Sequence, residues 1–319
     1  MRGPLVRYVL RRLLLAVPTV LAVVFLIFFA IDKAPGDPAT AVLGNFATPE
    51  QRDAFAQAND LDAPVVVRYV RFLGQLAHGN LGSSLIRPEP VAQLVGSALP
   101  VTLQLTALAA VLAILLATVM GAAAGYWQGT WVDRIVRTVS SAGVSAPDFW
   151  IGILAIQLFA VTLKVLPAGG YVPVQQDAVG WIRSLLMPAM VLAIPMSCAL
   201  AGVLRAALAD EMSKDYVRTA RGAGLPERVV LLRYALPNSL LSPITALVLR
   251  LGYLLAGAIV TEAVFNLPGL GTLLRLGVSQ GDYGVVQGVA IVATVLFIVL
   301  NLIVDLVQRI VSPRLREAV

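Results

Sequence analysis

Cysteine, histidine and charged residues are all scarce in this chain of 319 residues. The single cysteine, Cys198, excludes an internal disulfide and a cysteine-based structural zinc site. The single histidine, His78, argues against a multi-histidine metal centre or a histidine relay, so no metal site is expected. Charged residues make up 13% of the chain and hydrophobic residues 58%, whereas soluble domains carry roughly 25% charged residues. A soluble fold of this composition would expose a large apolar surface, so we predict an integral membrane protein.

Long apolar stretches give the expected fold. A bilayer core about 30 Å thick needs roughly 20 apolar residues in a helix. Six stretches meet this requirement, at residues 13–31, 101–126, 138–166, 185–204, 243–264 and 285–304. The third is interrupted at Pro147-Asp148. They predict an all-α protein with one transmembrane domain over 1–319, six membrane helices, and a long loop at 32–98.

The first stretch has a second possible interpretation, a cleaved signal peptide, because basic residues precede it. At residues 13–31 it is longer than the roughly 7–15 residues of a signal-peptide core, and no small-residue cleavage site follows cleanly. We therefore interpret it as a retained membrane span.

Lysine and arginine in the connecting segments predict the orientation. Residues 1–12 carry four arginines and no acid, and the 205–240 connection carries six basic residues. In the 32–98 loop acids outnumber bases. Both termini and the 205–240 segment are thus expected in the cytoplasm and the 32–98 loop outside. The net charge of +6 is attributed to topology, and nucleic acid is not expected as a partner.

The cytoplasmic segment 210–237 is too long for a simple turn. Its sequence predicts two short helices that meet at a glycine-rich corner. The second helix should begin near Pro226 and bury one stripe of residues spaced three and four apart, namely Val229, Leu232 and Leu236. A basic amphipathic segment of this kind can also rest on anionic lipid headgroups. The small residues at the corner favour close approach by another protein instead.

This segment resembles the cytoplasmic loop of ATP-binding-cassette importers, which has the form E-A-A, three residues, Gly, nine residues, I-x-L-P. The chain has Arg218-Thr219-Ala220, then Gly224, then Tyr234-x-Leu236-Pro237 at the same spacing. Asp215 to Leu225 match the form D-Y-V-R-T-A-R-x-x-G-L that is usual in the peptide-importer branch. The resemblance implies docking of the ATPase subunits at Asp215, Arg218, Thr219, Ala220, Arg221, Gly222, Ala223, Gly224 and Leu225.

Further motifs extend the resemblance to nearly the whole chain. They include Pro35-Gly36-Asp37-Pro38, Ser145-x-Pro147-x-Phe149-Trp150-x-Gly152, Glu262-x-Val264-Phe265-x-x-Pro268-Gly269-Leu270-Gly271 and Asp282-Tyr283. The chain is similar to the B-type permease subunit of bacterial dipeptide, oligopeptide and nickel importers. It departs from the family pattern at Asn59-Asp60 and at Asn80.

The resemblance implies a type I importer permease of the bacterial inner membrane, a pore-forming subunit without catalytic activity. Di- or oligopeptides are the expected cargo, and nickel complexes or another small solute the alternative. The implied partners are a second homologous permease, two nucleotide-binding ATPase domains and an extracytoplasmic substrate-binding protein. No cofactor is expected in this chain, because none of its three lysines follows a glycine as a P-loop lysine must. ATP and Mg would be held by the partner subunits.

Three charged residues lie within or at the ends of predicted spans, Asp148, Arg250 and Glu262. A charge at a span centre costs roughly 2.5–3.5 kcal/mol, so such residues usually face a cavity or a partner. Arg250 and Glu262 are about 18 Å apart along one helix and cannot pair there. We take the three residues as candidates for the translocation path or its gate. Burial against the partner permease is the alternative.

The outer loop carries a second candidate surface. A turn at Leu61–Pro64 should lead into a helix over 67–73, on which Tyr69, Phe72 and Leu73 share one face. Arg68 and Arg71 lie beside this face. The candidate docking residues for the binding protein are Arg68, Tyr69, Arg71 and Phe72, and plain structural packing is the alternative.

Two other function classes remain as weaker hypotheses. A secondary transporter driven by an ion gradient would show two repeated halves, and no internal repeat is visible. A membrane-embedded enzyme would need a convergent nucleophile or metal site, for which one histidine and one cysteine offer little.

Overall fold

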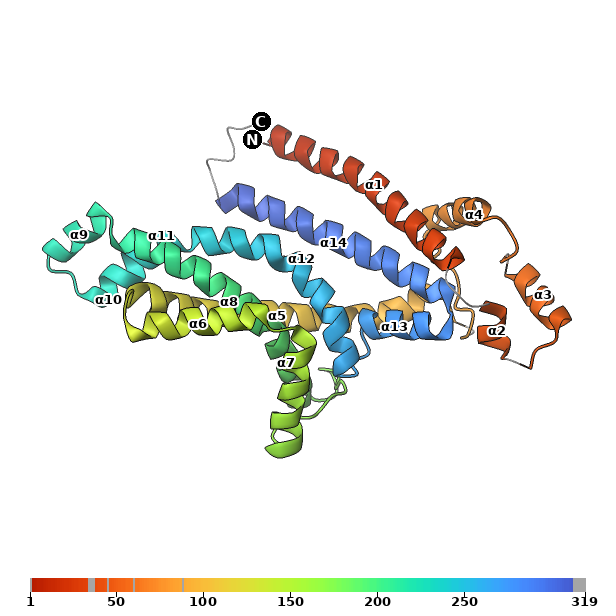
Figure 1. The fold of residues 1–319 in the computed structure, drawn as a ribbon. Coiled ribbons are helices and arrows are strands. Elements are labelled where there is room, and N and C mark those ends of the chain that lie inside the picture. The colour runs from red at the N-terminus through yellow and green to blue at the C-terminus, as the bar shows by residue number, and fades with distance from the viewer. Residues whose placement is uncertain (1, 34–37, 45, 60, 88, 312–319) are drawn as a thin grey trace. The chain divides into compact units, whose positions relative to one another are not determined.

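A computed structural model of the chain describes residues 1–319 except 1, 34–37, 45, 60, 88 and 312–319. The described residues are mostly helical and form no β-strand, only one isolated bridge between Ser83 and Pro90. Figure 1 shows these helices, coloured along the chain. The chain divides into two compact units. Unit 1 comprises Met1–Thr102 and Pro268–Leu302, and unit 2 comprises Leu103–Leu267 and Ile303–Val319.

Unit 1 contains the N-terminal helices and the helices that follow residue 268. They are α1 (Arg2–Asp32), α2 (Pro38–Leu43), α3 (Pro49–Ala58), α4 (Val65–Ala77), the start of α5 (Val91–Tyr126), α13 (Leu270–Gln280) and most of α14 (Tyr283–Val311). Helix α3 begins with a capping box, in which the Thr48 hydroxyl accepts from the Gln51 amide and the Gln51 side chain accepts from the Thr48 amide. The predicted turn before α4 and the predicted helix itself are confirmed.

Two apolar clusters hold unit 1 together. In the first, α4 packs on α1 through Phe72 and Phe28, with Val24 and Ile291 completing the buried set. In the second, the start of α5 packs against α13 and α14. The buried residues there are Val91, Leu94, Val95, Ala98, Leu270, Leu273, Val285 and Val289.

A buried carboxylate fastens the loop before α5 to the α13–α14 corner. Asp282 is 3% exposed and accepts hydrogen bonds from the Ser84 hydroxyl and from the backbone amides of Leu85 (3.1 Å) and Val285 (3.3 Å). The same side chain thus caps the first turn of α14 and holds the loop. Gly284 lies directly against the Ser83 carbonyl, where a Cβ atom would clash.

Unit 2 is built around α8, the most deeply buried long helix among those described. Its elements are the rest of α5, α6 (Trp131–Ser145), α7 (Asp148–Ala155), η1 (Ile156–Thr162), α8 (Ala178–Met212), α9 (Asp215–Gly222), α10 (Glu227–Val229), η2 (Val230–Ala235), α11 (Leu236–Ser239) and α12 (Leu241–Val264). Gly121 and Gly125 of α5 lie against Leu204 and Leu208 of α8. A Cβ atom at either glycine would come within 3 Å of the facing leucine. Two glycines four residues apart therefore allow α5 and α8 to pack closely, as is typical of helices in membranes.

Helix length and composition identify the candidate membrane spans. In the part of the chain that the structure describes, three helices are long and apolar enough to cross a bilayer, at Val91–Tyr126, Ala178–Met212 and Tyr283–Ile303. Two bent pairs bring the number to five if each is one span, Trp131–Ser145 with Asp148–Thr162 and Leu241–Leu247 with Gly252–Val264. Helix α1 contributes a shorter apolar segment, Leu14–Ala30. The structure is thus a mostly helical one with several helices suited to a membrane.

Several helices extend beyond the predicted membrane spans. Helix α5 begins at Val91, before the span predicted at 101–126, and α8 covers Ala178–Met212, around the span predicted at 185–204. An uncharged stretch marks only the part of a helix that suits hydrocarbon, while backbone hydrogen bonding continues into the polar ends. The third stretch begins at Trp131 and bends by 105° at its break. Ala146 there adopts an extended conformation (φ −79°, ψ 131°), as expected for a residue before proline.

Candidate functional site

The predicted glycine-rich corner is present in unit 2. Helix α9 ends in a Schellman motif, in which the Leu225 amide donates to the Ala220 carbonyl (3.3 Å) and the Gly224 amide to the Arg221 carbonyl (3.0 Å). Gly224 adopts a φ of +76°, the left-handed region that this motif requires. The backbone then turns into α10, which begins after Pro226. The sequence prediction of two short helices around a glycine corner is confirmed.

The inner face of α9 is anchored to the end of α8. Val217 is fully buried and Ala220 is 6% exposed, and both belong to a cluster with Leu208 of α8. Val230 and Ala235 of η2 complete the buried set. Ala220 therefore faces the interior of unit 2, and the exposed small residues of the corner are Gly222, Ala223 and Gly224.

The predicted apolar stripe of the second helix was wrong in register. Leu232 is 59% exposed, and the fully buried residues are Val230 and Ala235. Residues 230–235 form a π-helix, in which hydrogen bonds join residues five apart. A wider turn brings residues five apart onto one face, so spacings of three and four selected the wrong side chains.

The outer edge of the corner is open and charged. A Cβ atom added to Gly222 or to Gly224 would meet nothing within 4 Å. Across the corner, Arg221 forms a bidentate ion pair with Glu227, with Nε–Oε1 at 2.7 Å and Nη2–Oε2 at 3.3 Å. Arg218 pairs with Asp215 at 3.4 Å. The corner thus presents exposed backbone, and two ion pairs, Arg221 with Glu227 and Arg218 with Asp215, lie beside it.

Polar contacts brace α9 from its first turn. The Tyr216 hydroxyl donates to Glu211 of α8 at 2.5 Å and accepts from the Asn238 side chain at 3.3 Å. Burial, together with the bond to Glu211, raises the pKa of Tyr216 above its ordinary value. Lys214 pairs with Glu211 and Asp210, and the bond to Glu211 raises the pKa of Lys214. These contacts connect the start of α9 to the end of α8 and to α11.

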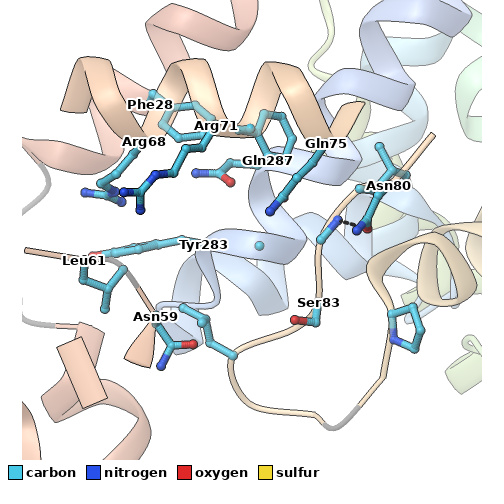
Figure 2. A pocket seen from close by; sticks show the side chains of 16 residues that line it. Phe28, Asn59, Leu61, Arg68, Arg71, Gln75, Asn80, Ser83, Tyr283 and Gln287 are labelled. Atoms are coloured by element: carbon cyan, nitrogen blue, oxygen red, sulfur yellow. Dashed lines mark hydrogen bonds between the residues drawn. The ribbon is translucent and has the colours of Figure 1, made fainter. Parts of the chain in front are cut away.

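A polar pocket of about 480 Å³ lies within unit 1 (Figure 2). Arg68 and Arg71 of α4 line it, so two of the four residues predicted at the outer surface come together there. The other two are used in packing. Tyr69 donates to the Leu21 carbonyl at 3.1 Å, and Phe72, although it touches the pocket, is 7% exposed.

The three charges predicted within the membrane lie in different surroundings. Glu262 is fully buried, and Asp148 is half-buried at the start of α7. A Cβ atom on Gly257 of α12 would come within 3.1 Å of the Asp148 Oδ2 atom, so α7 and α12 approach closely at this carboxylate. Arg250 is exposed on α12.

One ion pair in unit 2 was missed by the sequence reasoning. Asp133 of α6 receives two bonds from Arg205 of α8, from Nε at 2.5 Å and from Nη2 at 2.8 Å. The Gly129 amide adds a third at 3.0 Å, and the Asp133 side chain is 2% exposed. A signal was available, since Asp133 is the single acid between residues 90 and 147. A lone acid in an apolar stretch calls for a cationic partner.

Metal-ligating side chains do not gather in the described part of the chain. No group of three or more histidine, cysteine, aspartate or glutamate residues lies together there as a metal site would require. The corner and the pocket remain as surfaces whose geometry suggests recognition.

Comparisons with known proteins identify the family. A family model described as "Binding-protein-dependent transport system inner membrane component" matches residues 113–317, and the model of the N-terminal part of such membrane components matches residues 5–106. The chain belongs to this family. The predicted resemblance to importer permeases of the ATP-binding-cassette class is thus confirmed, and the protein is a multi-pass membrane permease.

Relatives span nearly the full chain. A Brucella abortus protein named as a peptide transport system permease is 39% identical over 308 residues, which cover 97% of this chain and 98% of the relative. A glutathione transport system permease protein of Escherichia coli is 35% identical over 312 residues, covering 98% and 99%. A crystal structure of an amino acid ABC transporter with histidines matches with a TM-score of 0.50 and 15% identity. It covers 68% of this chain and 94% of that chain, and it supports the fold.

Proposed function

We propose that the permease forms, together with a second homologous permease, the pore of an ATP-driven importer for di- or oligopeptides. A separate binding protein outside the membrane would deliver the peptide. The observation that carries this proposal is the end-to-end similarity, at 35–39% identity, to permeases named for peptide and glutathione transport. The permease itself carries no catalytic step, and ATP with Mg is bound by the partner ATPase subunits.

The proposed topology has six membrane spans, with both termini in the cytoplasm and the 32–98 loop outside. Five spans correspond to the three long apolar helices and the two bent pairs. The sixth is α1, whose apolar segment Leu14–Ala30 lies within a helix of 31 residues. The distribution of arginine and lysine supports the orientation.

Site-directed labelling tests this topology. In a Cys198→Ala background, a cysteine at Gln57 on α3 should react with an impermeant maleimide added to intact spheroplasts. A cysteine at Ser213, which is exposed between α8 and α9, should react only after the membrane is opened. Labelling of Ser213→Cys from outside would overturn the orientation.

The cytoplasmic corner is the proposed dock for the ATPase subunits. Gly222, Ala223 and Gly224 leave the backbone open, so a partner surface can approach it closely. Because Val217 and Ala220 pack on Leu208, a force on the corner is transmitted to the end of α8. ATP-driven closure of the ATPase dimer would thus move α8 and alternate access to the pore.

Purification from the native host tests the assembly and the cargo together. An affinity tag on the permease should co-purify a second permease and ATPase subunits, identified by mass spectrometry. The complex is then reconstituted in proteoliposomes, with the binding protein added on the face opposite the ATPase subunits. Radiolabelled dipeptide or tripeptide should cross the membrane only when ATP is present on the side of the ATPase subunits. Uptake of nickel complexes without peptide uptake would assign the alternative cargo, and uptake driven by an ion gradient without ATP would reject the importer.

A further inference from the structure

The pocket in unit 1 is formed by two helix faces and a connecting loop. From α4 come Arg68, Arg71 and Gln75, which are three and four residues apart and so lie along one side of the helix. From the first turns of α14 come Tyr283 and Gln287, four residues apart. Figure 2 shows the three α4 side chains reaching towards the two from α14.

The polar lining is made almost entirely of hydrogen-bond donors and neutral groups. Two guanidinium groups and the amides of Gln75 and Gln287 can all donate to one guest in the pocket. The described residues that line the pocket include no aspartate or glutamate. Asp282 precedes Tyr283, but its carboxylate accepts from Ser84, Leu85 and Val285. The described part of the lining thus offers two guanidinium groups and no acidic side chain.

Both arginines and Tyr283 already take part in other interactions within the chain. Such interactions restrict the conformations of these side chains. A guanidinium has five N–H donors in a planar fork, so one partner does not exhaust it. A planar carboxylate is the anion that matches this fork with two parallel bonds.

Apolar side chains complete the wall. Phe28 of α1 and Phe72 of α4 lie at one part of the pocket, and Leu61, Leu81 and Leu85 contribute from the adjoining loops. A volume of about 480 Å³ falls within the usual range for small-molecule sites. A guest that combines a carboxylate, amide groups and an apolar side chain would use every part of this lining.

We propose that this pocket binds a small peptide-like carboxylate, with the carboxylate on Arg68 and Arg71 and the amide groups at Gln75 and Gln287. The permease would then hold a solute with a free carboxylate on its own, without the binding protein and outside the coupling corner. Carboxylate binding does not depend on the transport function proposed above. That the solute is also the cargo does rest on that function.

Equilibrium binding to the permease complex in nanodiscs, stripped of binding protein and without ATP, tests the proposal. The probe is the dipeptide Ala-Phe, compared with its C-terminal amide. We expect saturable binding of Ala-Phe and at least tenfold weaker binding of the amide. Equal binding of the two, or no saturable binding, would overturn the proposal.

Variants connect the binding to the pocket. The double change Arg68→Gln, Arg71→Gln should weaken Ala-Phe binding at least tenfold, while Arg68→Lys, Arg71→Lys should recover part of it, because the charge remains without the planar fork. Arg87→Gln is the matched control, since Arg87 is exposed in the same unit and does not line the pocket. Unchanged binding in the glutamine double variant would disprove the site. If that variant does not assemble, Gln287→Leu, which should weaken binding severalfold, takes its place, and unchanged binding there would also disprove the site.

A competition arm separates carboxylate from other anions. Inorganic phosphate should displace Ala-Phe only at concentrations at least tenfold above those of acetylated alanine, a competitor with one carboxylate. Displacement by phosphate at equal or lower concentration would reject a carboxylate site in favour of a site for phosphate groups such as lipid headgroups. ATP-dependent uptake measured in parallel distinguishes the two proposals, because failure of the pocket leaves uptake intact.

Discussion

Helices α4 and α9 both pack one apolar side against a longer helix, but the surfaces that they contribute to differ. Helix α4 packs through Phe72 on Phe28 of α1, and α9 packs through Val217 on Leu208 of α8. The side of α4 that carries Arg68, Arg71 and Gln75 lines a polar pocket, whereas α9 ends in an open corner of small residues. A pocket lined by charged and polar side chains suits a small ligand, and exposed backbone without side chains suits close approach by a protein. In both helices, the buried apolar residues hold the helix in place, and the residues outside the packed face determine which kind of partner can bind.

The largest expected effect concerns the proposed docking of ATPase subunits at the α9 corner. Gly222→Trp should reduce co-purification of the ATPase subunits at least tenfold, because an indole would cover backbone that the partner must approach. Gly222 is a cleaner choice than Gly224, whose positive φ strains any other residue. The matched control is Gly74→Trp on α4, which is also exposed, helical and open around the missing Cβ. Normal assembly of Gly222→Trp would remove the corner from the proposed mechanism.

The next effect tests the anchoring of α4. Phe72→Ala should destabilise unit 1 by roughly 3–5 kcal/mol, because it removes a buried ring that packs on Phe28 with ring centroids 5.2 Å apart. Limited proteolysis should show faster cleavage around α4, with the α9 corner protected as before. Phe46→Ala, at a fully exposed ring, should change neither. Equal proteolysis of both variants would mean that α4 is held by other contacts.

A smaller effect concerns the contact between α6 and α8. Arg205→Met should lower stability by about 1.5–3 kcal/mol, since it leaves the buried Asp133 carboxylate without its two-pronged partner. Thermal unfolding in detergent measures this loss. Arg137→Met is the control, because Arg137 is 59% exposed and lies 3.6 Å from the same carboxylate. A larger loss for Arg137→Met than for Arg205→Met would contradict the assignment.

The smallest effect concerns the ion pair across the corner. Arg221→Ala should cost about 0.5 kcal/mol, because both partners are partly exposed to solvent. The reversed pair, Arg221→Glu with Glu227→Arg, should restore most of that stability in a double-mutant cycle. A coupling energy near zero would show that the charges flank the corner without stabilising it.

Local patterns predicted much of this fold. Apolar stretches located helices that overlap most of the expected spans, and the apolar residues Tyr69, Phe72 and Leu73 of α4 share one face as predicted. The position of Gly224 after α9 correctly indicated a corner, because its spacing matched a known motif and its φ value needs glycine.

Features that depend on tertiary contact were less accessible. The π-helix that buries Val230 and Ala235 is favoured by packing and has no period of its own in the sequence. The pocket joins Arg68 to Gln287, which are more than 200 residues apart, so no local pattern could reveal it. Pro147 predicted a break in the third stretch, but a proline alone does not fix a bend of 105°.

The left-handed backbone at Gly224 also limits which residues the corner can carry. Any side chain at this position would be strained, so variation at residue 224 cannot distinguish one ATPase from another. Under the proposed docking, the specificity of related importers for their own ATPases must therefore come from neighbouring residues that tolerate substitution. Arg218, Asp215 and Glu227 are exposed beside the corner and meet that condition. Exchanging this charged trio between paralogous permeases would therefore redirect partner choice, whereas exchanging the glycine could not.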